Sequence, residues 1–542
     1  MKKNFLLIIL AILLPLAAGA RNYDGECGDN LSWTIDTETY TLIISGTGDM
    51  YNYTYNVTDS CAPWYDYRDY IDYITVESGV TNIGDDAFTF CEYLKSATLP
   101  NTITSIGRRA FYGCKRLGEI TIPNSVTRIS DIAFAVCYKL KTITIPSSVV
   151  SIGRSILCVS RDLETVVVEP GNPVYDSREN CNAIIETATN TLVWGYENTV
   201  IPNTVTAIGD HAFSNCRKLT SIEIPNSVTS IGSDAFNYCI GLTSLTIPNS
   251  VVTIGKSAFD NCTKLTSIVL PDTLTTIEEK LFYCCTKLTS VIIPSNVTTI
   301  GRYAFGNCQA ITDIALPNSV SYIGEGAFNN CMKLKTIIIP DLVTSIEKET
   351  FLKCDSLESI TLPSNITSIG SRAFYECKSL KYIEIPESTT FIGYMAFRRC
   401  WNLTFVRSLA MVPPTCEDDN VFEKKTVESV TLYVPEDCVN VYKEAHEWSR
   451  FISIEELYPG QGVCENQQAR VSLFPNPAES LINVNCENIR SLEIYSSDGK
   501  QVKRMTVFGS EAQVDISELG SGIYILNIET THEIITKKLI VR

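Results

Sequence analysis

Cysteine is the residue type whose spacing stands out in this sequence. Twelve of the 21 cysteines recur at an interval of 23 residues. These ladder cysteines are Cys91, Cys114, Cys137, Cys216, Cys239, Cys262, Cys285, Cys308, Cys331, Cys354, Cys377 and Cys400. Such thiols could form disulfides between repeats outside the cytosol, or could be buried as small apolar groups. Burial is favoured, because parallel stacking would hold the Cβ atoms about 4.8 Å apart, beyond the usual range for a disulfide.

Residues able to do catalysis or to hold a metal are sparse. The three histidines, His211, His446 and His532, lie far apart, so they do not indicate a metal site or a Ser-His-Asp arrangement. The sequence has no Cys-x-x-Cys pair and no glycine-rich phosphate loop. The net charge of −17 disfavours nucleic acid, which binds basic surfaces. We therefore expect no enzyme, no cofactor, no metal and no nucleic-acid partner.

The elements that position the cysteines repeat with the same period. Cys216–Phe236 reads CRKLTSIEIPNSVTSIGSDAF, in which Leu219–Ile224 predicts a short strand and Val228–Ile231 a second extended piece. Gly232 predicts a bend with positive φ, and Ser233–Tyr238 predicts a helical turn that closes the coil. A fixed period of this length is typical of a solenoid, in which neighbouring coils bury one another's faces. The predicted fold class is a β-rich solenoid of 23-residue coils with a parallel sheet.

The chain begins with the pattern of a secretory signal peptide. Lys2 and Lys3 precede an apolar run over Phe5–Leu16, and Ala18-Gly-Ala20 supplies the small residues of a cleavage site. The apolar run is too short to span a membrane, and no later apolar stretch is long enough. We therefore expect an exported chain with no transmembrane segment.

Changes of pattern mark the expected domains. Residues 158–200 interrupt the period and predict an irregular coil with a hairpin, while the stretch after residue 408 predicts a strand and then a helix with Tyr442 and Trp448 on one face. The expected domains are a signal peptide (1–20), an N-terminal β cap (21–79), the solenoid (80–408), an α/β C-terminal cap (409–457), a linker (458–468) and a small C-terminal β-sandwich (469–542).

An aromatic cluster lies in the predicted N-terminal cap. It consists of Trp64, Tyr65, Tyr67, Tyr70 and Tyr73. Such a group can present a platform for carbohydrate, or it can form the core of the cap with its tyrosine hydroxyls in water. The second interpretation is favoured.

The repeat pattern C-x-x-L-T-S-I-x-I-P-x-S-V-T-S-I-G-x-x-A-F resembles the bacterial surface leucine-rich repeats of the BspA-like type. The resemblance spans about Val80 to Val406. It implies a leucine-rich repeat solenoid in an exported or cell-surface protein, and members of this family are often regarded as adhesins. Because a fold does not determine a function, that role enters as an expectation.

The last residues resemble a different family. Phe474-Pro-Asn-Pro477, Leu519–Ile525 and the closing Lys537–Arg542 look like the C-terminal sorting domain of the type IX secretion system. The resemblance implies passage across the outer membrane, then removal of the tail with release or attachment to lipopolysaccharide. The sorting-signal residues it implies are Pro475, Asn476, Pro477, Gly522, Tyr524, Lys537 and Lys538.

Residues that vary between copies indicate a candidate partner-binding site. On the exposed face of the predicted sheet, one row becomes apolar over four consecutive coils, where Thr and Glu are otherwise common. This apolar row is Val269, Ile292, Ala315 and Ile338, with Ser290, Asp313 and Thr336 among its polar neighbours. An apolar stripe rimmed by polar groups is typical of an interaction surface. The alternative is the ordinary preference of β-strands for Val and Ile.

The sequence thus predicts an exported, adhesin-like binding protein that is extracellular or attached to the cell surface. Its partner would be a host or bacterial surface protein or a glycan, and the tail would engage the type IX secretion machinery. A structural surface-layer or stalk protein without a specific ligand is the alternative, and an enzyme comes third.

Overall fold

The computed structural model describes residues 23–55, 57, 60–418, 420–457, 472–474, 478, 480–496, 500–530 and 534–541. The expected signal peptide and linker lie outside them. The chain divides into two compact units: the first comprises Met1–Thr312, Pro317–Leu334 and Glu347–Asp355, and the second Asp313–Leu316, Lys335–Ile346 and Ser356–Arg542. No helix within the described residues is long and apolar enough to cross a bilayer.

An antiparallel sheet opens the first unit and continues into its coils. β1 (Asp24–Gly28), β2 (Leu31–Asp36) and β3 (Thr41–Gly46) pair antiparallel in that order. β4 (Tyr73–Val76), which follows the 3-10 helix η1 (Tyr65–Tyr70), pairs with β3 in parallel. The cap therefore presents a strand on which the first coil can stack.

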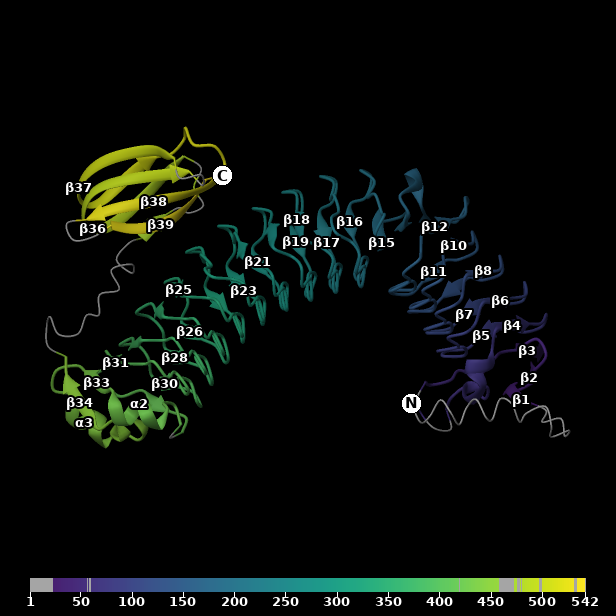
Figure 1. Cartoon of the computed structure of the whole chain (residues 1–542), viewed down its shortest axis with the longest axis horizontal. Helices are drawn as coiled ribbons and strands as arrows, with labels where there is room; N and C mark the ends of the chain where they lie inside the picture. The colour runs from purple at the N-terminus through teal and green to yellow at the C-terminus, as the bar shows by residue number, and fades with distance from the viewer. Residues whose placement is uncertain are drawn as a thin grey trace. The chain divides into compact units, whose positions relative to one another are not determined.

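Most regular coils add short parallel strands to two rows, as the ribbon of each unit shows (Figure 1). In the first unit the first strand row is β4, β6 (Ser96–Thr98), β8 (Glu119–Ile120), β10 (Thr142–Ile145), β12 (Thr165–Val168), β18 (Ser244–Thr246), β20 (Ser267–Val269) and β22 (Ser290–Val291). Its second strand row is β5 (Asn82–Ile83), β7 (Ser105–Ile106), β9 (Arg128–Ile129), β11 (Ser151–Ile152), β16 (Ala207–Ile208), β17 (Ser230–Ile231), β19 (Thr253–Ile254), β21 (Thr276–Ile277), β23 (Thr299–Ile300) and β24 (Tyr322–Ile323).

The second unit repeats this arrangement. Its first strand row is β25 (Thr336–Ile338), β27 (Ser359–Thr361), β29 (Tyr382–Ile385), β31 (Phe405–Ser408), β33 (Thr431–Val434) and β34 (Ser453–Glu456). Its second strand row is β26 (Ser345–Ile346), β28 (Ser368–Ile369), β30 (Phe391–Ile392) and β32 (Thr415–Cys416). The fold of the repeats is thus a β-solenoid with parallel sheets.

The turn that closes each coil is bonded to the next coil. The backbone N–H groups of Asp234, Phe236 and Tyr238 donate to carbonyl oxygens of the following coil at 2.8–2.9 Å. Asp234 and Tyr238 have φ values of 54° and 57°, in the left-handed region. The expected helical turn over Ser233–Tyr238 is therefore wrong, because these amides point along the stack instead of back into their own coil.

Two further expectations for this copy need correction. Gly232 has no positive φ; a Cβ there would lie 2.5 Å from the backbone nitrogen of Asp210, so glycine permits the coils to approach closely. Leu219–Ile224 forms no strand, although the next two copies supply β18 and β20. The coil before it is the irregular one, which offers no regular strand as a partner.

Phenylalanine rings fill the space between coils. Successive ring centroids lie 5.1–5.9 Å apart, and each ring is buried. The rings in this column of the first unit are Phe213, Phe236, Phe259, Phe282, Phe305, Phe328 and Phe351. One aromatic side chain per coil thereby links the hydrophobic contacts of each coil to those of the next.

The ladder cysteines are buried beside this column. Nine of them donate S–H to the carbonyl of a phenylalanine 26 residues earlier, at 3.1–3.3 Å. Ser160, which lies 23 residues after Cys137, makes the same contact with the Phe134 carbonyl. Burial raises the pKa of Cys285 well above its ordinary value. These contacts need the protonated thiol, which agrees with the buried alternative for the ladder.

The irregular coil contains three strands and a short helix. β13 (Tyr175–Asp176), β14 (Ala183–Glu186) and β15 (Thr191–Gly195) pair antiparallel, with η2 (Arg178–Asn180) between the first two. β15 then pairs with β16 in parallel, so the second strand row resumes. Gly195 packs against the Phe213 ring, where a Cβ would lie 2.4 Å from the nearest ring atom.

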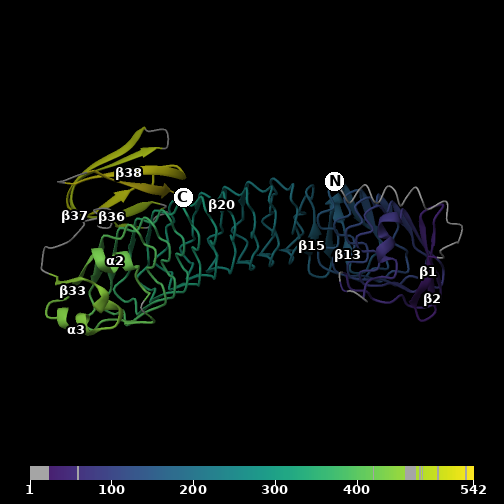
Figure 2. The same ribbon diagram turned by 60° about the horizontal axis from the view of Figure 1, so that its bottom comes forward.

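The C-terminal cap of the second unit is more broken than the sequence indicates. It contains α2 (Lys424–Ser429), α3 (Val439–Glu444) and the 3-10 helix η3 (Glu447–Arg450), which lie beside β33 (Figure 2). The expected single helix ends before Ala445, which has extended backbone. Tyr442 and Trp448 are nevertheless both buried, and the Trp448 indole donates to the Pro414 carbonyl at 2.8 Å.

The tail is an antiparallel sheet around its own core. It comprises β35 (Ser472–Phe474), β36 (Leu481–Ser496), β37 (Gln501–Asp515), β38 (Gly522–Thr530) and β39 (Ile534–Val541). The start of β36 pairs with β35, and its end pairs with β38. Register shifts between these parts bend the long strand around a core that includes Ile482, Leu492 and Leu526.

The protonated thiols predict a loss of stability at alkaline pH. A buried thiol with a raised pKa stabilises the fold below the ordinary thiol pKa of about 8.5, and this contribution is lost as pH rises further. Each thiol that ionises only in the unfolded chain lowers the free energy of unfolding by about 1.4 kcal/mol per pH unit. Urea unfolding between about pH 8.5 and 10 should therefore show a shallower pH dependence for Cys262→Ala with Cys285→Ala than for the parent. Identical pH dependence would contradict the protonated ladder.

Candidate binding surface

The first half of the apolar row lies on the exposed face of the first strand row. β20 and β22 pair in register, and their Ile268 and Val291 side chains are buried. Val269 points the other way and is 55% exposed, whereas Ile292 is half-buried. Ser290 beside them is half-buried as well.

The second half of the row lies in the second unit with the same alternation. Asp313 bridges to Thr336 in parallel, and both are exposed. Ile314 and Ile337 are buried, while Ala315 is exposed and Ile338 is 57% exposed. Period-two alternation therefore assigns these residues to the solvent face in each unit.

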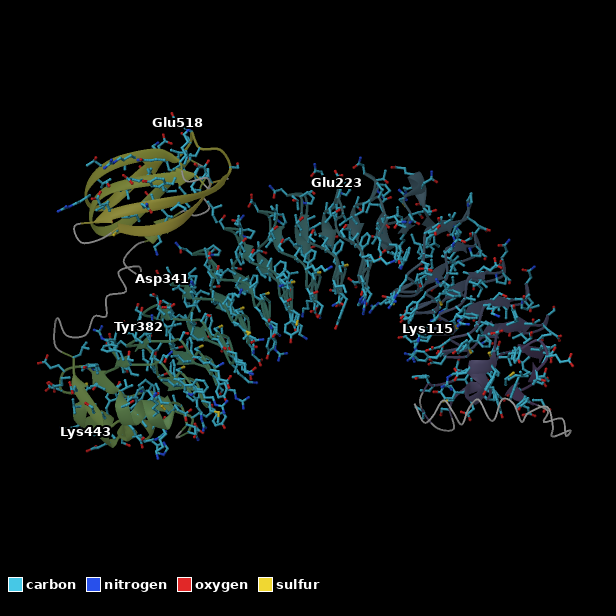
Figure 3. The ribbon with its side chains drawn as sticks, viewed as in Figure 1. Lys115, Glu223, Asp341, Tyr382, Lys443 and Glu518 are labelled. Carbon is cyan, nitrogen blue, oxygen red and sulfur yellow. The ribbon has the colours of Figure 1, made fainter. Side chains whose placement is uncertain are left out.

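Val200 is an apolar residue that the sequence analysis missed on this face. It is 72% exposed and precedes Ile201-Pro202, just as Glu223 precedes Ile224-Pro225. Matching these Ile-Pro pairs would have located it despite the interrupted period. Figure 3 labels Glu223, which stands before the Ile-Pro pair of its coil, and Lys115, next to a ladder cysteine, on opposite sides of the ribbon of the first unit.

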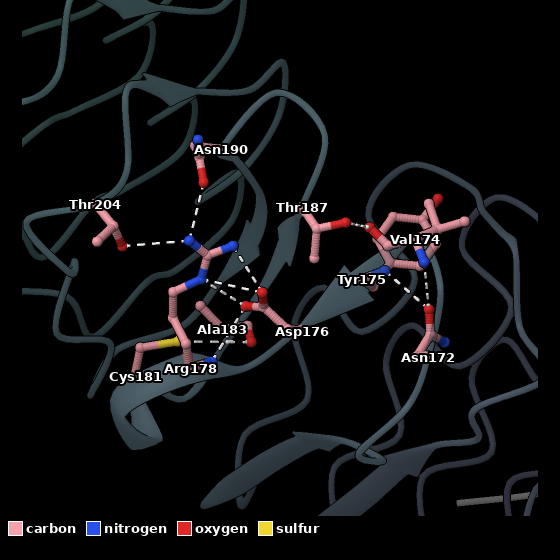
Figure 4. Close-up of polar contacts among 10 residues, drawn as sticks. All are labelled: Asn172, Val174, Tyr175, Asp176, Arg178, Cys181, Ala183, Thr187, Asn190 and Thr204. Atoms are coloured by element: carbon pink, nitrogen blue, oxygen red, sulfur yellow. Dashed lines mark hydrogen bonds and ion pairs between the residues drawn. The ribbon is translucent and has the colours of Figure 1, made fainter.

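Polar side chains hold the irregular coil together (Figure 4). The Arg178 guanidinium pairs with Asp176 at 2.6 Å and donates to Asn190 and Thr204 at 2.9 and 3.4 Å. Asn172 accepts backbone hydrogen bonds from Val174 and Tyr175 through its side-chain oxygen. Arg178 thus joins η2 to the hairpin and to the start of the next coil.

The same coil covers the edge of β12. The amides of Val166 and Val168 donate to the side chains of Asn182 and Ser177 at 2.8 and 3.0 Å. The Asn182 amide group also donates to the carbonyl of Glu164 at 3.0 Å. Side chains here replace a neighbouring strand, so these edge groups are not available for pairing with another chain.

The aromatic cluster of the N-terminal cap is partly core. Trp64 is buried, and its ring stacks on Phe88 with centroids 5.6 Å apart. Tyr70 and Tyr73 are exposed, whereas Tyr65 and Tyr67 are half-buried. Trp64 thus continues the packed rings of Phe88, Phe111 and Phe134 into the cap and offers no face to a carbohydrate.

Asp260 lies on the turn side of the first unit and is a carboxylate with a raised pKa. It follows Phe259, is half-buried, and accepts a hydrogen bond from the Asn261 side chain at 2.8 Å. Burial raises the pKa of Asp260 to about 6, Lys280 opposes this shift, and Asp234 adds to it. Asn237 and Asn329 occupy the same position in other coils.

The sorting-signal residues are only partly described. Pro475, Asn476 and Pro477 lie outside the described residues. Gly522 and Tyr524 are on β38, where the Tyr524 hydroxyl donates to the Gly520 carbonyl at 2.9 Å. Lys537 and Lys538 are on β39, opposite Leu526 and Ile525, and burial lowers the pKa of Lys537.

No cluster of three or more His, Cys, Asp or Glu side chains able to hold a metal ion occurs in the described part of the chain.

The repeats of this chain match a known protein family. The family model of the BspA type leucine-rich repeat region matches residues 64–181, 193–312 and 275–404, together more than half of the chain. The chain belongs to the BspA-type leucine-rich repeat family.

The tail of this BspA-type protein matches a second family. The model of the secretion system C-terminal sorting domain covers residues 472–542, the whole tail sheet. The match to a sorting domain indicates that the protein is exported toward the cell surface or the extracellular space. Neither family model describes a catalytic domain.

Solved structures similar to this BspA-type chain are bacterial leucine-rich repeat proteins. One from Eubacterium ventriosum is 26% identical, with 65% of this chain and 94% of that chain covered and a TM-score of 0.49. One from Bacteroides ovatus is 22% identical, with 80% and 100% covered and a TM-score of 0.43. A leucine-rich cell surface protein from Faecalibacterium prausnitzii is 25% identical, with 71% and 94% covered and a TM-score of 0.37. No curated protein matches the chain.

The raised pKa of Asp260 predicts that Asp260→Asn stabilises the protein at neutral pH. Because the folded-state pKa lies above the unfolded value of about 3.9, the stabilisation from the neutral carboxyl is complete below that value and is lost as pH rises through about 6. Thermal unfolding at neutral pH should show a gain of about 1–3 kcal/mol, which disappears at about pH 4. The exposed Asp341→Asn serves as control. A gain that is the same at both pH values would contradict burial of the charge.

Proposed function

We propose that this protein is an exported cell-surface binding protein that recognises a host or bacterial surface protein or glycan through the exposed face of the first strand row. The observation that carries the proposal is the exposure of Val269 and Ile338, each more than half exposed at the last position of its strand.

Comparison along the row supports a binding role over simple strand preference. Thr246 and Thr361 stand at the same position in the coils that flank the apolar row, and both are exposed. These strands therefore form without an apolar residue at this position, so the apolar residues are not required by the sheet. An apolar group on a rigid sheet loses little conformational entropy when a partner covers it.

The tail supports the exported location. A binding face of this kind can meet a partner from outside only if the solenoid crosses the outer membrane, which is the task of a sorting domain in the type IX system. We propose that the tail is removed after this step, with the solenoid either released or attached to lipopolysaccharide.

The binding face is tested by replacing its exposed apolar residues. Val269→Glu with Ile338→Glu should weaken saturable binding of the labelled full-length chain to epithelial cells and to whole bacterial cells by about tenfold or more, because a few central apolar contacts carry most of the binding energy. The thermal unfolding midpoint should hardly move, since surface changes usually cost under about 0.5 kcal/mol.

Thr246→Glu with Thr361→Glu is the matched control, because it adds the same charges at the same position in the adjacent coils. It should reduce binding much less. Equal binding by the apolar-row variant and the parent would exclude this face. Binding by the parent that rises linearly without saturation would favour a stalk without a ligand.

The export proposal has its own test. Deleting residues 470–542 should leave the protein in the periplasm, because the signal peptide would still carry it across the inner membrane. Protease treatment of intact cells should then degrade the full-length protein at the surface and spare the truncated one. Normal surface display of the truncated protein would refute a sorting role for the tail.

A further inference from the structure

A cluster of cations lies where the irregular coil interrupts the stack. We call Tyr138, Lys139, Arg161, Arg217 and Lys218 the cationic patch. The Lys218 ammonium donates to the carbonyl of Arg161, 57 residues earlier in the sequence, at 2.6 Å. The patch thus joins segments from both sides of the irregular coil within the first unit.

The two arginines of the patch present their charge outward. The Arg161 guanidinium lies over the Tyr138 ring, 4.3 Å from its centroid, and both arginines are exposed. Arg217 lies close enough to Cys158 to oppose the rise of that thiol's pKa, which burial raises to about 11. Among the described residues neither arginine forms an ion pair with a carboxylate, whereas Lys139 pairs with Asp162 at 2.8 Å and Lys218 with Glu197 at 3.9 Å.

Several cations in the regular coils form ion pairs with a carboxylate of a neighbouring coil. Elsewhere in the first unit, several cations pair with a carboxylate one period away. Examples are Lys95 with Asp72, Lys115 with Glu92, Lys256 with Glu279 and Arg302 with Glu325, at 2.5–3.4 Å. At the patch Lys139 keeps such a partner in Asp162, one period later, whereas Arg161 and Arg217 leave a local excess of positive charge on a chain whose net charge is −17.

We propose that the cationic patch binds an anionic polysaccharide that carries carboxylate or sulfate groups. Guanidinium groups bind such planar or tetrahedral oxyanions through paired N–H donors. The half-buried Tyr138 ring adds a flat apolar surface against which a sugar ring can pack. A polymer can engage several cations at once, so individually weak surface contacts combine into a useful affinity.

This site is separate from the proposed binding face. Tyr138 and Arg217 directly follow ladder cysteines, as Lys115 does, and Figure 3 shows Lys115 and Glu223 on opposite sides of the first unit. Changes in one surface can therefore be tested without altering the other.

The test measures binding of the full-length chain to immobilised polygalacturonate and dextran sulfate, with uncharged dextran as the reference. The parent should bind at least one charged polymer and not dextran, and salt should weaken the binding by screening. Arg161→Ser with Arg217→Ser should weaken it by about tenfold, because two charge-assisted contacts are lost. Arg161→Lys with Arg217→Lys should retain more binding than the serine variant.

The matched control is Lys264→Ser with Lys287→Ser, which removes two exposed cations from regular coils, one residue further along the turn than Arg217. It should change binding by less than about twofold. Equal losses in both variants would show that net charge alone drives binding and would overturn the proposal. The proposal would also be overturned if the parent bound neither charged polymer, or if it bound polyglutamate or double-stranded DNA more tightly than these polymers. Unchanged thermal unfolding of each variant confirms that the fold is intact.

Discussion

The structure depends on hydrogen bonding between the backbones of successive coils. In most regular coils the first strand, the second strand and the closing turn all bond to the neighbouring coil. The apolar side chains of a single coil cannot offset the entropy of ordering 23 residues, so a coil is stable only within a stack. The phenylalanine column and the ladder thiols occupy the interior that this stacking creates. The hydrogen bonds from the thiols to phenylalanine carbonyls of the preceding coils add to the same contacts.

Stacking also separates the residues that hold the fold from those free to acquire a function. On the strands, Ile268 and Ile337 face the core, whereas Val269 and Ile338 face solvent and have threonine at the same position in flanking coils. Substitution on the solvent face leaves the core contacts unchanged. A repeat protein of this kind can therefore change its binding surface coil by coil while the backbone stays the same.

The irregular coil shows what happens when the backbone contacts between coils are interrupted. Asn182 and Ser177 accept the hydrogen bonds that a strand would otherwise accept, and Arg178 links the hairpin to the next coil. Arg161 and Arg217 are exposed in the same region. An interruption of the period can thus place cations from coils on both sides of it next to one another.

The sequence by itself determined the coil length, the buried positions and the placement of the ladder cysteines, because a repeated pattern of apolar residues has one consistent stacking solution. It also indicated the sorting tail through local motifs. Only the tertiary structure decided the left-handed turn at Asp234 and Tyr238, the reason for Gly232, the missing strand over Leu219–Ile224 and the exposure of Val200. Each of these depends on the coil before or after it, and such a contact between coils leaves no signal within a single 23-residue copy.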